Sequence, residues 1–253
     1  MKRILLLSAL GFSIYLVFLL ARAPAGLILN LVPETDDVYM QAPAGSLWRG
    51  RIGQLQVGPV HLSGVEWRLS AARLLLGRAD MRVSGDLDRG RLEGRLIAHP
   101  NGNLRIASAM GQQIPVSRLA PLFGQAPTAL SGEGAFEIRD MLIRDQLPYS
   151  GEAELRVFNL ESRIMGHQRL GNFSGQLSGN EGSFVLSFTD VGEDAPFNLS
   201  GQVDFEAESR SYRLDGRILA RETAPENIAG MLSYLGEPDE EGRYPLRLSG
   251  RLR

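Results

Sequence analysis

The 253-residue sequence contains no cysteine. It therefore forms no disulfide and offers no thiolate as a metal ligand or a nucleophile. Histidine is scarce as well: His61, His99 and His167 lie in separate segments, without the short spacings that metal sites use. We expect each histidine to be a strand or turn residue rather than a ligand.

Charge of one sign is not in excess either. The chain has 27 Lys and Arg against 29 Asp and Glu, a formal net charge of −2, and both signs are spread along it. Without a basic stripe we expect no nucleic-acid partner. The acidic runs at 36–37 and 239–241 lack the spacing of a calcium loop, and we interpret them as solvated loops. No nucleophile elbow, phosphate-binding loop or zinc-protease helix is present, so the residues indicate no enzyme and no cofactor.

Long apolar runs are also missing, with one exception. Residues 4–21 carry no charge, and their length approaches the roughly 20 apolar residues that cross a bilayer. Lys2 and Arg3 precede the run, so the lysine and arginine bias leaves the first three residues in the cytoplasm. We therefore expect a single-pass inner-membrane protein with a cytoplasmic segment 1–3 and a transmembrane anchor 4–23. The predicted anchor residues include Ile4, Leu5, Leu10, Phe12, Tyr15, Phe18 and Leu20.

A cleaved signal peptide is the alternative for this run, because Ala21 and Ala23 have the small-residue pattern of a cleavage site. Against cleavage, Pro24 would follow the cut, and the run exceeds the usual length of about 7–15 residues. We favour the uncleaved anchor, and a buried soluble helix ranks third. Residues 24–44, with three prolines, are predicted to be a connector. Residues 45–253 are predicted to form one periplasmic β domain.

Apolar and polar residues alternate along most of the remaining chain, which predicts half-buried strands. Turn-forming sequences at 88–90, 101–102 and 180–182 separate successive strands, as in hairpins. A fully buried parallel sheet would show continuous apolar runs instead, so we expect an antiparallel meander with one apolar and one polar face. The alternating segments are 51–57, 65–69, 81–87, 91–98, 135–139, 152–157, 183–188, 203–208, 212–218 and 246–252.

Glycine recurs at positions on the apolar face, among them Gly85, Gly94, Gly201, Gly216 and Gly250. Glycine inside a strand costs about 0.5–1 kcal/mol, so its recurrence suggests a use. A sheet that curls towards its apolar face crowds the side chains there, and glycine relieves the crowding. Bulges or strand ends are the alternative explanation. We expect a strongly curved sheet.

Helices are predicted only at 70–76, 116–123 and 224–235. They are too short to cover the apolar side chains of ten or more strands, each of which contributes about 1.5–3 kcal/mol when buried. The sheet must fold over on itself or meet something apolar from outside. We therefore predict a mainly β fold with a half-open apolar groove. The candidate groove residues are Val83, Leu96, Phe136, Leu155, Phe184, Leu186, Phe188, Val203, Phe205, Leu214 and Leu248.

Several ordered motifs resemble a known family. They include the sequence around Trp48 (residues 45–50), the sequence around Trp67 (65–69) followed by 74–77, the segments 104–116 and 130–134, and the C-terminal sequences at 231–236 and 242–252. Their order and spacing resemble protein N of the bacterial type II secretion system, the general secretion pathway. The alternating, glycine-rich pattern is similar to the wider AsmA-like group of periplasmic β-groove proteins.

The resemblance implies a non-enzymatic, bitopic inner-membrane protein that is accessory to the export of folded proteins across the outer membrane. It implies no catalytic residue. Two hypotheses follow. In the first, the periplasmic sheet contacts other secretion-system proteins, for which a free strand edge is a natural docking place. In the second, the apolar face binds lipid acyl chains and assists lipid transfer or outer-membrane assembly. Packing is the preferred interpretation of Trp48 and Trp67.

Overall fold

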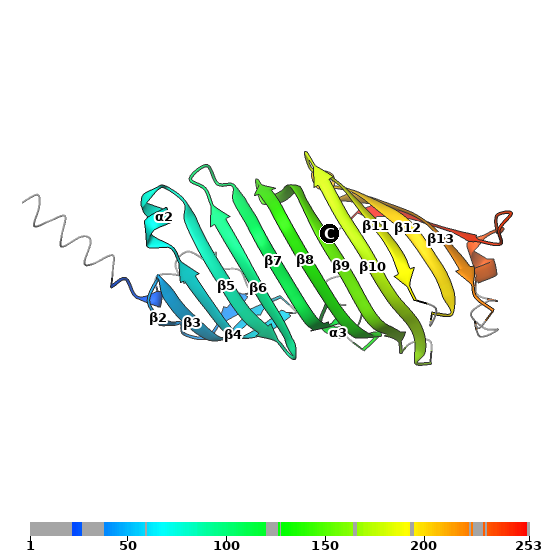
Figure 1. Ribbon diagram of the computed structural model, residues 1–253, viewed down its shortest axis with the longest axis horizontal. Coiled ribbons are helices and arrows are strands. Elements are labelled where there is room, and N and C mark those ends of the chain that lie inside the picture. The colour runs from blue at the N-terminus through cyan, green and yellow to red at the C-terminus, as the bar shows by residue number, and fades with distance from the viewer. Residues whose placement is uncertain are drawn as a thin grey trace, which may run out of the picture.

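The fold was analysed in a computed structural model, which describes residues 22–26, 38–58, 60–119, 126, 128–163, 166–192, 195–222, 224, 230 and 232–251. A single sheet of fourteen antiparallel strands makes up nearly all of this part of the chain (Figure 1). The predicted mainly β, antiparallel meander is confirmed. Of the predicted anchor, 4–23, residues 4–21 lie outside the described residues. Within the described residues, no helix combines the length and the apolar character that a membrane crossing requires.

Each strand pairs with the next one along the chain, from β3 to β14, while β1 and β2 both pair with β3. The path of paired strands ends at β1 and β14, which are not hydrogen-bonded to each other within the described residues. The strands are β1 (Val38–Met40), β2 (Ala44–Gly45), β3 (Arg49–Val57), β4 (Val60–Leu69), β5 (Ala79–Leu87), β6 (Gly90–Ala98), β7 (Leu104–Pro115), β8 (Leu130–Arg144), β9 (Leu147–Ser162), β10 (Gln168–Asn180), β11 (Ser183–Val191), β12 (Phe197–Glu206), β13 (Ser211–Ala220) and β14 (Tyr244–Arg251).

The hairpin turns follow the predicted turn chemistry. Between β10 and β11, Glu181 and Gly182 both have positive φ, which two-residue hairpins of the favoured hand require. Asp88 adopts φ 54° in the β5–β6 turn, and Gly102 adopts φ 84° between β6 and β7. Short turns of this kind force neighbouring strands to be consecutive in sequence, which is why the sheet is a meander.

Glycines on the apolar face lie beneath large side chains of the neighbouring strands. The Phe136 ring and the Leu92 side chain lie over Gly111, and the Phe188 ring lies over Gly201 and Gly216. A Cβ atom added to Gly201 would come within 2.7 Å of the Gly216 Cα. Backbones this close on one side of a sheet converge on that side. The apolar face is therefore the inner face of the curve at β12 and β13.

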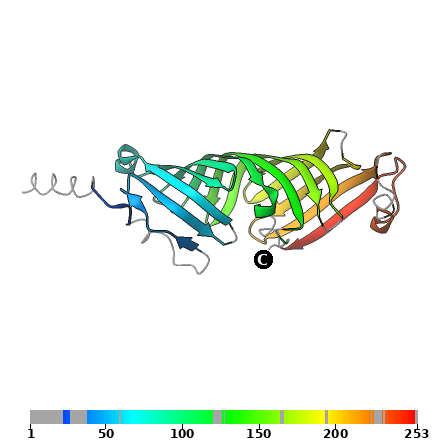
Figure 2. The ribbon, with the colours of Figure 1, turned by 90° about the horizontal axis from the view of Figure 1, so that it is seen from below.

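Figure 2 shows the sheet as an arch, with the central strands at the crest and the strands of both ends turned down on the same side. The glycines at crowded positions on the apolar face agree with the curling that the sequence predicted.

Helices are few, as expected. The helix predicted at 70–76 is α2 (Ala71–Leu75), and the one predicted at 116–123 begins as α3 (Val116–Leu119), followed by residues outside the described part. Of the helix predicted at 224–235, the described end is the 3₁₀ turn η3 (Ser233–Leu235), after which Gly236 has φ 125°. The strand predicted at 203–208 ends at Glu206.

The segment at the N-terminal end of the sheet packs against the apolar face. Ala25 forms a buried cluster with Ile52, Val65 and Trp67. Pro24 makes an isolated bridge to Ser46. The interval 24–44, predicted as a connector, thus includes β1, the first residue of β2 and a side chain of the core.

We predict that Gly201→Ala destabilises the fold by about 1–3 kcal/mol, because its methyl group would collide with the Gly216 backbone and the Phe188 ring. Gly94→Ala is the matched control: its methyl group would lie 3.6 Å from the nearest atom, the Ser108 carbonyl oxygen, which is ordinary contact. Urea denaturation of the two purified full-length variants measures the difference. Equal stability of both variants would contradict the crowding argument.

Candidate functional site

All eleven candidate groove residues lie on one face of the sheet. They fall mainly into two cross-strand rows, which the pairing register defines. The first row reads Val83, Gly94, Ala109, Ile138, Ala153, Leu177, Leu186, Val203, Leu214 and Leu248. The second reads Gly85, Leu92, Gly111, Phe136, Leu155, Gly175, Phe188, Gly201, Gly216 and Leu246. Leu96 lies on the same face opposite Met81, and Phe184 opposite Phe205.

This face, called the apolar face below, is only partly covered. Phe184 is buried at 3% exposure, whereas Leu155 and Leu248 remain 37% and 54% exposed. The other candidate groove residues are half-buried. The two rows thus place aliphatic and aromatic side chains, with glycines between them, on one face across ten strands.

One ion pair lies on the apolar face, and sequence reasoning missed it. Asp190 is buried at 9% exposure, and its Oδ2 is 2.5 Å from Arg221 Nη2. The Leu199 amide donates to Asp190 Oδ1 at 2.9 Å, and Arg221 also donates to the Gly192 carbonyl oxygen. The sequence did hold a signal for this placement: Asp190 continues the every-second-residue pattern of Phe184, Leu186 and Phe188, which puts it on the apolar face. The pair ties the end of β11 to the residue that follows β13.

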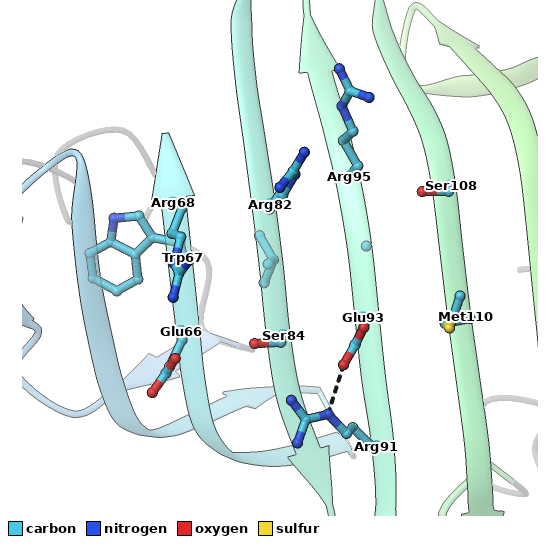
Figure 3. Close-up of a pocket in the computed structure, with 12 residues that line it drawn as sticks. Glu66, Trp67, Arg68, Arg82, Ser84, Arg91, Glu93, Arg95, Ser108 and Met110 are labelled. Atoms are coloured by element: carbon cyan, nitrogen blue, oxygen red, sulfur yellow. Dashed lines mark hydrogen bonds and ion pairs between the residues drawn. The ribbon is translucent and has the colours of Figure 1, made fainter. Parts of the chain in front are cut away.

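The opposite face, called the polar face, carries open clefts between long side chains. One of them, with a volume of about 560 Å³, lies over β4, β5, β6 and β7 and is shown in Figure 3. Arg68, Arg82 and Arg95 line it side by side, together with Glu66 and Glu93. On the outer side of a curved sheet the side chains diverge, which leaves such gaps.

Four arginines stand directly opposite one another across β3 to β6. The register pairs Arg49 with Arg68, Arg68 with Arg82, and Arg82 with Arg95; we call these four residues the arginine row. Like charges directly opposite each other destabilise a sheet. Within the part of the chain that the structure describes, Arg95 is the member of the row with an ion pair, through Asp80. Sequence reasoning missed the row, because single arginines in alternating strands give no sign of their register.

Asp80 joins the polar face to helix α2. Its carboxylate is buried at 5% exposure and accepts hydrogen bonds from Arg95 at 2.8 and 3.1 Å and from Arg73 of α2. The hydrogen bond from Arg95 is the main cause that holds the pKa of Asp80 below its ordinary value, and the Arg73 guanidinium lowers this pKa further. The short helix is thereby fixed against the sheet.

The remaining residues singled out in the sequence occupy structural positions. Trp67 is buried and donates from Nε1 to the Leu47 carbonyl oxygen at 3.1 Å, so it packs as expected. His61 lies in β4, His99 in the β6–β7 loop, and His167 in the turn before β10. Among the described residues, no group of three or more His, Cys, Asp or Glu side chains is placed to hold a metal ion.

Comparison with known proteins places these features in a family context. The profile of the family described as Type II secretion system (T2SS), protein N matches residues 36–247. Proteins named Type II secretion system protein N from Aeromonas hydrophila and Vibrio cholerae are 25% and 26% identical to this chain, each over 100% of both chains. The Klebsiella pneumoniae protein of the same name is 25% identical over 99% of this chain and 97% of its own. No solved structure matches. The profile match begins just before β1 and ends within β14, so it covers the sheet from its first strand into its last.

We predict that Asp80→Asn lowers the free energy of unfolding by about 1–3 kcal/mol at pH 7, because it removes a buried carboxylate that accepts charged hydrogen bonds. A carboxylate whose pKa is lowered on folding stabilises the fold above its unfolded pKa of about 4, and the contribution is lost as the pH falls further. In urea denaturation the difference between the wild type and the variant should therefore narrow as the pH falls from about 4 through the lowered pKa of Asp80. Asp88→Asn, which removes an exposed pair with Arg118, is the control. A gap between wild type and Asp80→Asn that persists in acid would contradict this account.

Proposed function

This chain belongs to the type II secretion system protein N family, and from that premise we propose that it is a non-enzymatic, inner-membrane-anchored component of the system. Its sheet lies in the periplasm and supports the export of folded proteins across the outer membrane. The single observation that carries the proposal is the family match over residues 36–247, which spans the sheet from its first strand to its last.

Two features of the N-terminal segment support membrane attachment. Residues 4–21 are uncharged and follow Lys2 and Arg3, an arrangement that favours a cytoplasmic start. Directly after them, the Leu47 amide donates to the Ala23 carbonyl oxygen at 2.9 Å, and Ala25 packs in the Trp67 cluster. A chain entering from the membrane would thus be attached to the sheet within a few residues.

Other secretion-system proteins are the proposed protein partners. Strand β14 is the C-terminal end of the paired path, so one of its edges offers backbone groups for strand addition. Arg247 and Arg251 are exposed on this strand, and charged side chains at an edge disfavour indiscriminate pairing. An edge of this kind is suited to a defined partner strand.

Lipid binding by the apolar face is the second candidate function, and the exposure of Leu155 and Leu248 favours it. Each apolar side chain left in water forgoes about 1.5–3 kcal/mol of burial energy, so a row of them favours an apolar occupant. Acyl chains are such an occupant. The two functions are compatible, because a lipid-filled apolar face can belong to a secretion component.

Removal of the gene from a bacterium with an active type II system should reduce the secreted fraction of a type II substrate and leave that substrate in the periplasm. We expect the full chain to restore secretion. A version whose residues 1–21 are replaced by a cleavable signal peptide should restore it less well, because the sheet is then free of the membrane. Immunoblots of both proteins control for their amounts. Normal secretion in the deletion strain would contradict the proposed function.

The occupant of the apolar face can be identified by photo-crosslinking in living cells. A photoreactive residue at Leu186, on the apolar face, should give lipid adducts by mass spectrometry if acyl chains lie there. The neighbouring Val185 is a matched control, since it is 36% exposed and lies on the polar face of the same strand. Adducts to secretion-system proteins at Leu186 would instead indicate a protein-binding face. Reaction only within the chain would rule out the lipid function.

A further inference from the structure

Helix α2 presents leucines to solvent in a way that the fold does not require. Leu75 and Leu76 are 89% and 79% exposed, and Leu74 is 38% exposed; we call these three residues the leucine tip. None of the residues of α2 is buried. Single exposed apolar residues are ordinary, but Leu74 and Leu75 of this five-residue helix and Leu76 directly after it form an apolar projection that no described segment covers.

The arginine row lies at the same end of the sheet as the leucine tip. Arg68 precedes α2 by three positions, and Arg82 lies in β5, the strand that follows it. The row places like charges opposite one another at an energetic cost, while Arg49, Arg68 and Arg82 are exposed. Arg95 of the row is paired with Asp80, and Glu66 and Glu93 line the same cleft, but the other three arginines of the row form no ion pair within the described residues. Exposed guanidinium groups of this kind suit an anionic partner, because guanidinium binds phosphate oxygens in a bidentate manner.

Asp80 holds the two features together. Arg73 of α2 and Arg95 of the row bind the same carboxylate, so the helix is fixed beside the row on the polar face. Leu76 and Arg78 line a cleft of about 460 Å³ there, together with Ile97 and His99. Leu76 of the leucine tip therefore shares a cleft with the positive charges of Arg73 and Arg78, and Arg73 is joined through Asp80 to Arg95 of the row.

This end of the sheet is also close to the point where the chain leaves the predicted anchor. The Leu47 amide donates to the Ala23 carbonyl oxygen, and the Leu69 amide donates to the Trp48 carbonyl oxygen, which links Ala23 to the residue just before Ser70 and α2. Figure 1 shows α2 at the same end of the sheet as β2, β3 and β4.

We propose that the α2 end of the sheet docks onto an anionic phospholipid bilayer. Leu75 and Leu76 enter the boundary between headgroups and acyl chains, and Arg68 and Arg82 lie against headgroup phosphates. An apolar projection with flanking basic residues is the pattern of interfacial membrane binding. The inference rests on the proposed membrane attachment and adds a second contact, which sets the orientation of the sheet relative to the bilayer.

The absence of native cysteine makes a direct test possible in the full chain. Leu75→Cys carries a spin label, and the full-length protein is reconstituted in vesicles of phosphatidylcholine with phosphatidylglycerol. Tyr234→Cys is the matched control, because Tyr234 is equally exposed at 89% but lies in η3, beside β14. Accessibility of the label to a water-soluble nickel complex is compared with accessibility to oxygen, which concentrates in the bilayer.

We expect the nickel accessibility at position 75 to fall about threefold or more in these vesicles relative to detergent micelles, while the label at 234 stays unchanged. In phosphatidylcholine vesicles, or after Arg68→Gln with Arg82→Gln, the label at 75 should return towards the accessibility of the control. If the nickel accessibility at position 75 falls equally in phosphatidylcholine vesicles and in the doubly substituted protein, the role assigned to the arginine row is overturned.

Flotation of the same vesicles separates this inference from the proposed function. If the chain floats with vesicles but the label at 75 stays as accessible to nickel as the label at 234, docking is overturned and membrane attachment stands. If the chain does not float, both attachment and docking fail. If the deletion strain secretes its type II substrate normally while the vesicle results are as expected, only the proposed secretion role is overturned.

Discussion

The cross-strand register is the constraint on which the structure depends. Because each strand pairs with its sequence neighbour, a residue's parity in one strand fixes which face it occupies throughout the sheet. A slip of one position would exchange the faces of Leu186 and Val185 and of every residue in their rows. Bulges adjust this parity where it would fail, as between Gly111 and Ile114, where Gln113 takes φ 54° and Ile114 stays buried.

The same register explains why large and small residues share the apolar face. Gly111 lies beneath Phe136 and Leu92, and Gly201 lies beneath Phe188. The sheet can therefore curve towards this face without displacing the two phenylalanine rings. The apolar face obtained in this way is wide and incompletely covered. A soluble sheet of this kind would normally bury that face against a second layer. The exposed apolar side chains of this face, such as Leu155 and Leu248, are therefore left without a covering layer within the described residues.

The polar face is not uniform either. Its ion pairs, such as Arg105 with Asp140 and Arg139 with Glu137, balance charge over the middle of the sheet. At the α2 end the arginine row has Asp80 as its neutralising carboxylate. The protein thus carries an apolar inner face, a balanced outer face and a basic end with exposed leucines. The three surfaces differ in polarity and charge, so each suits a neighbour of different chemistry.

The sequence alone determined that the chain forms antiparallel strands joined by hairpin turns, such as those at 88–90 and 180–182. It also determined that Phe184, Leu186 and Phe188 share one face. Both follow from the sequence because alternation and turn chemistry act between residues close in the chain. Strands β7 and β10 were not predicted as alternating segments, since alanine, serine and glycine blur their contrast and a bulge shifts the parity of β7. The arginine row, the Asp80 link to α2 and the Asp190–Arg221 pair were decided only by the tertiary structure. These contacts depend on which residues stand opposite one another on neighbouring strands. The turns and bulges together set that register, and the residues that meet are too far apart in the sequence for a local pattern to show their pairing.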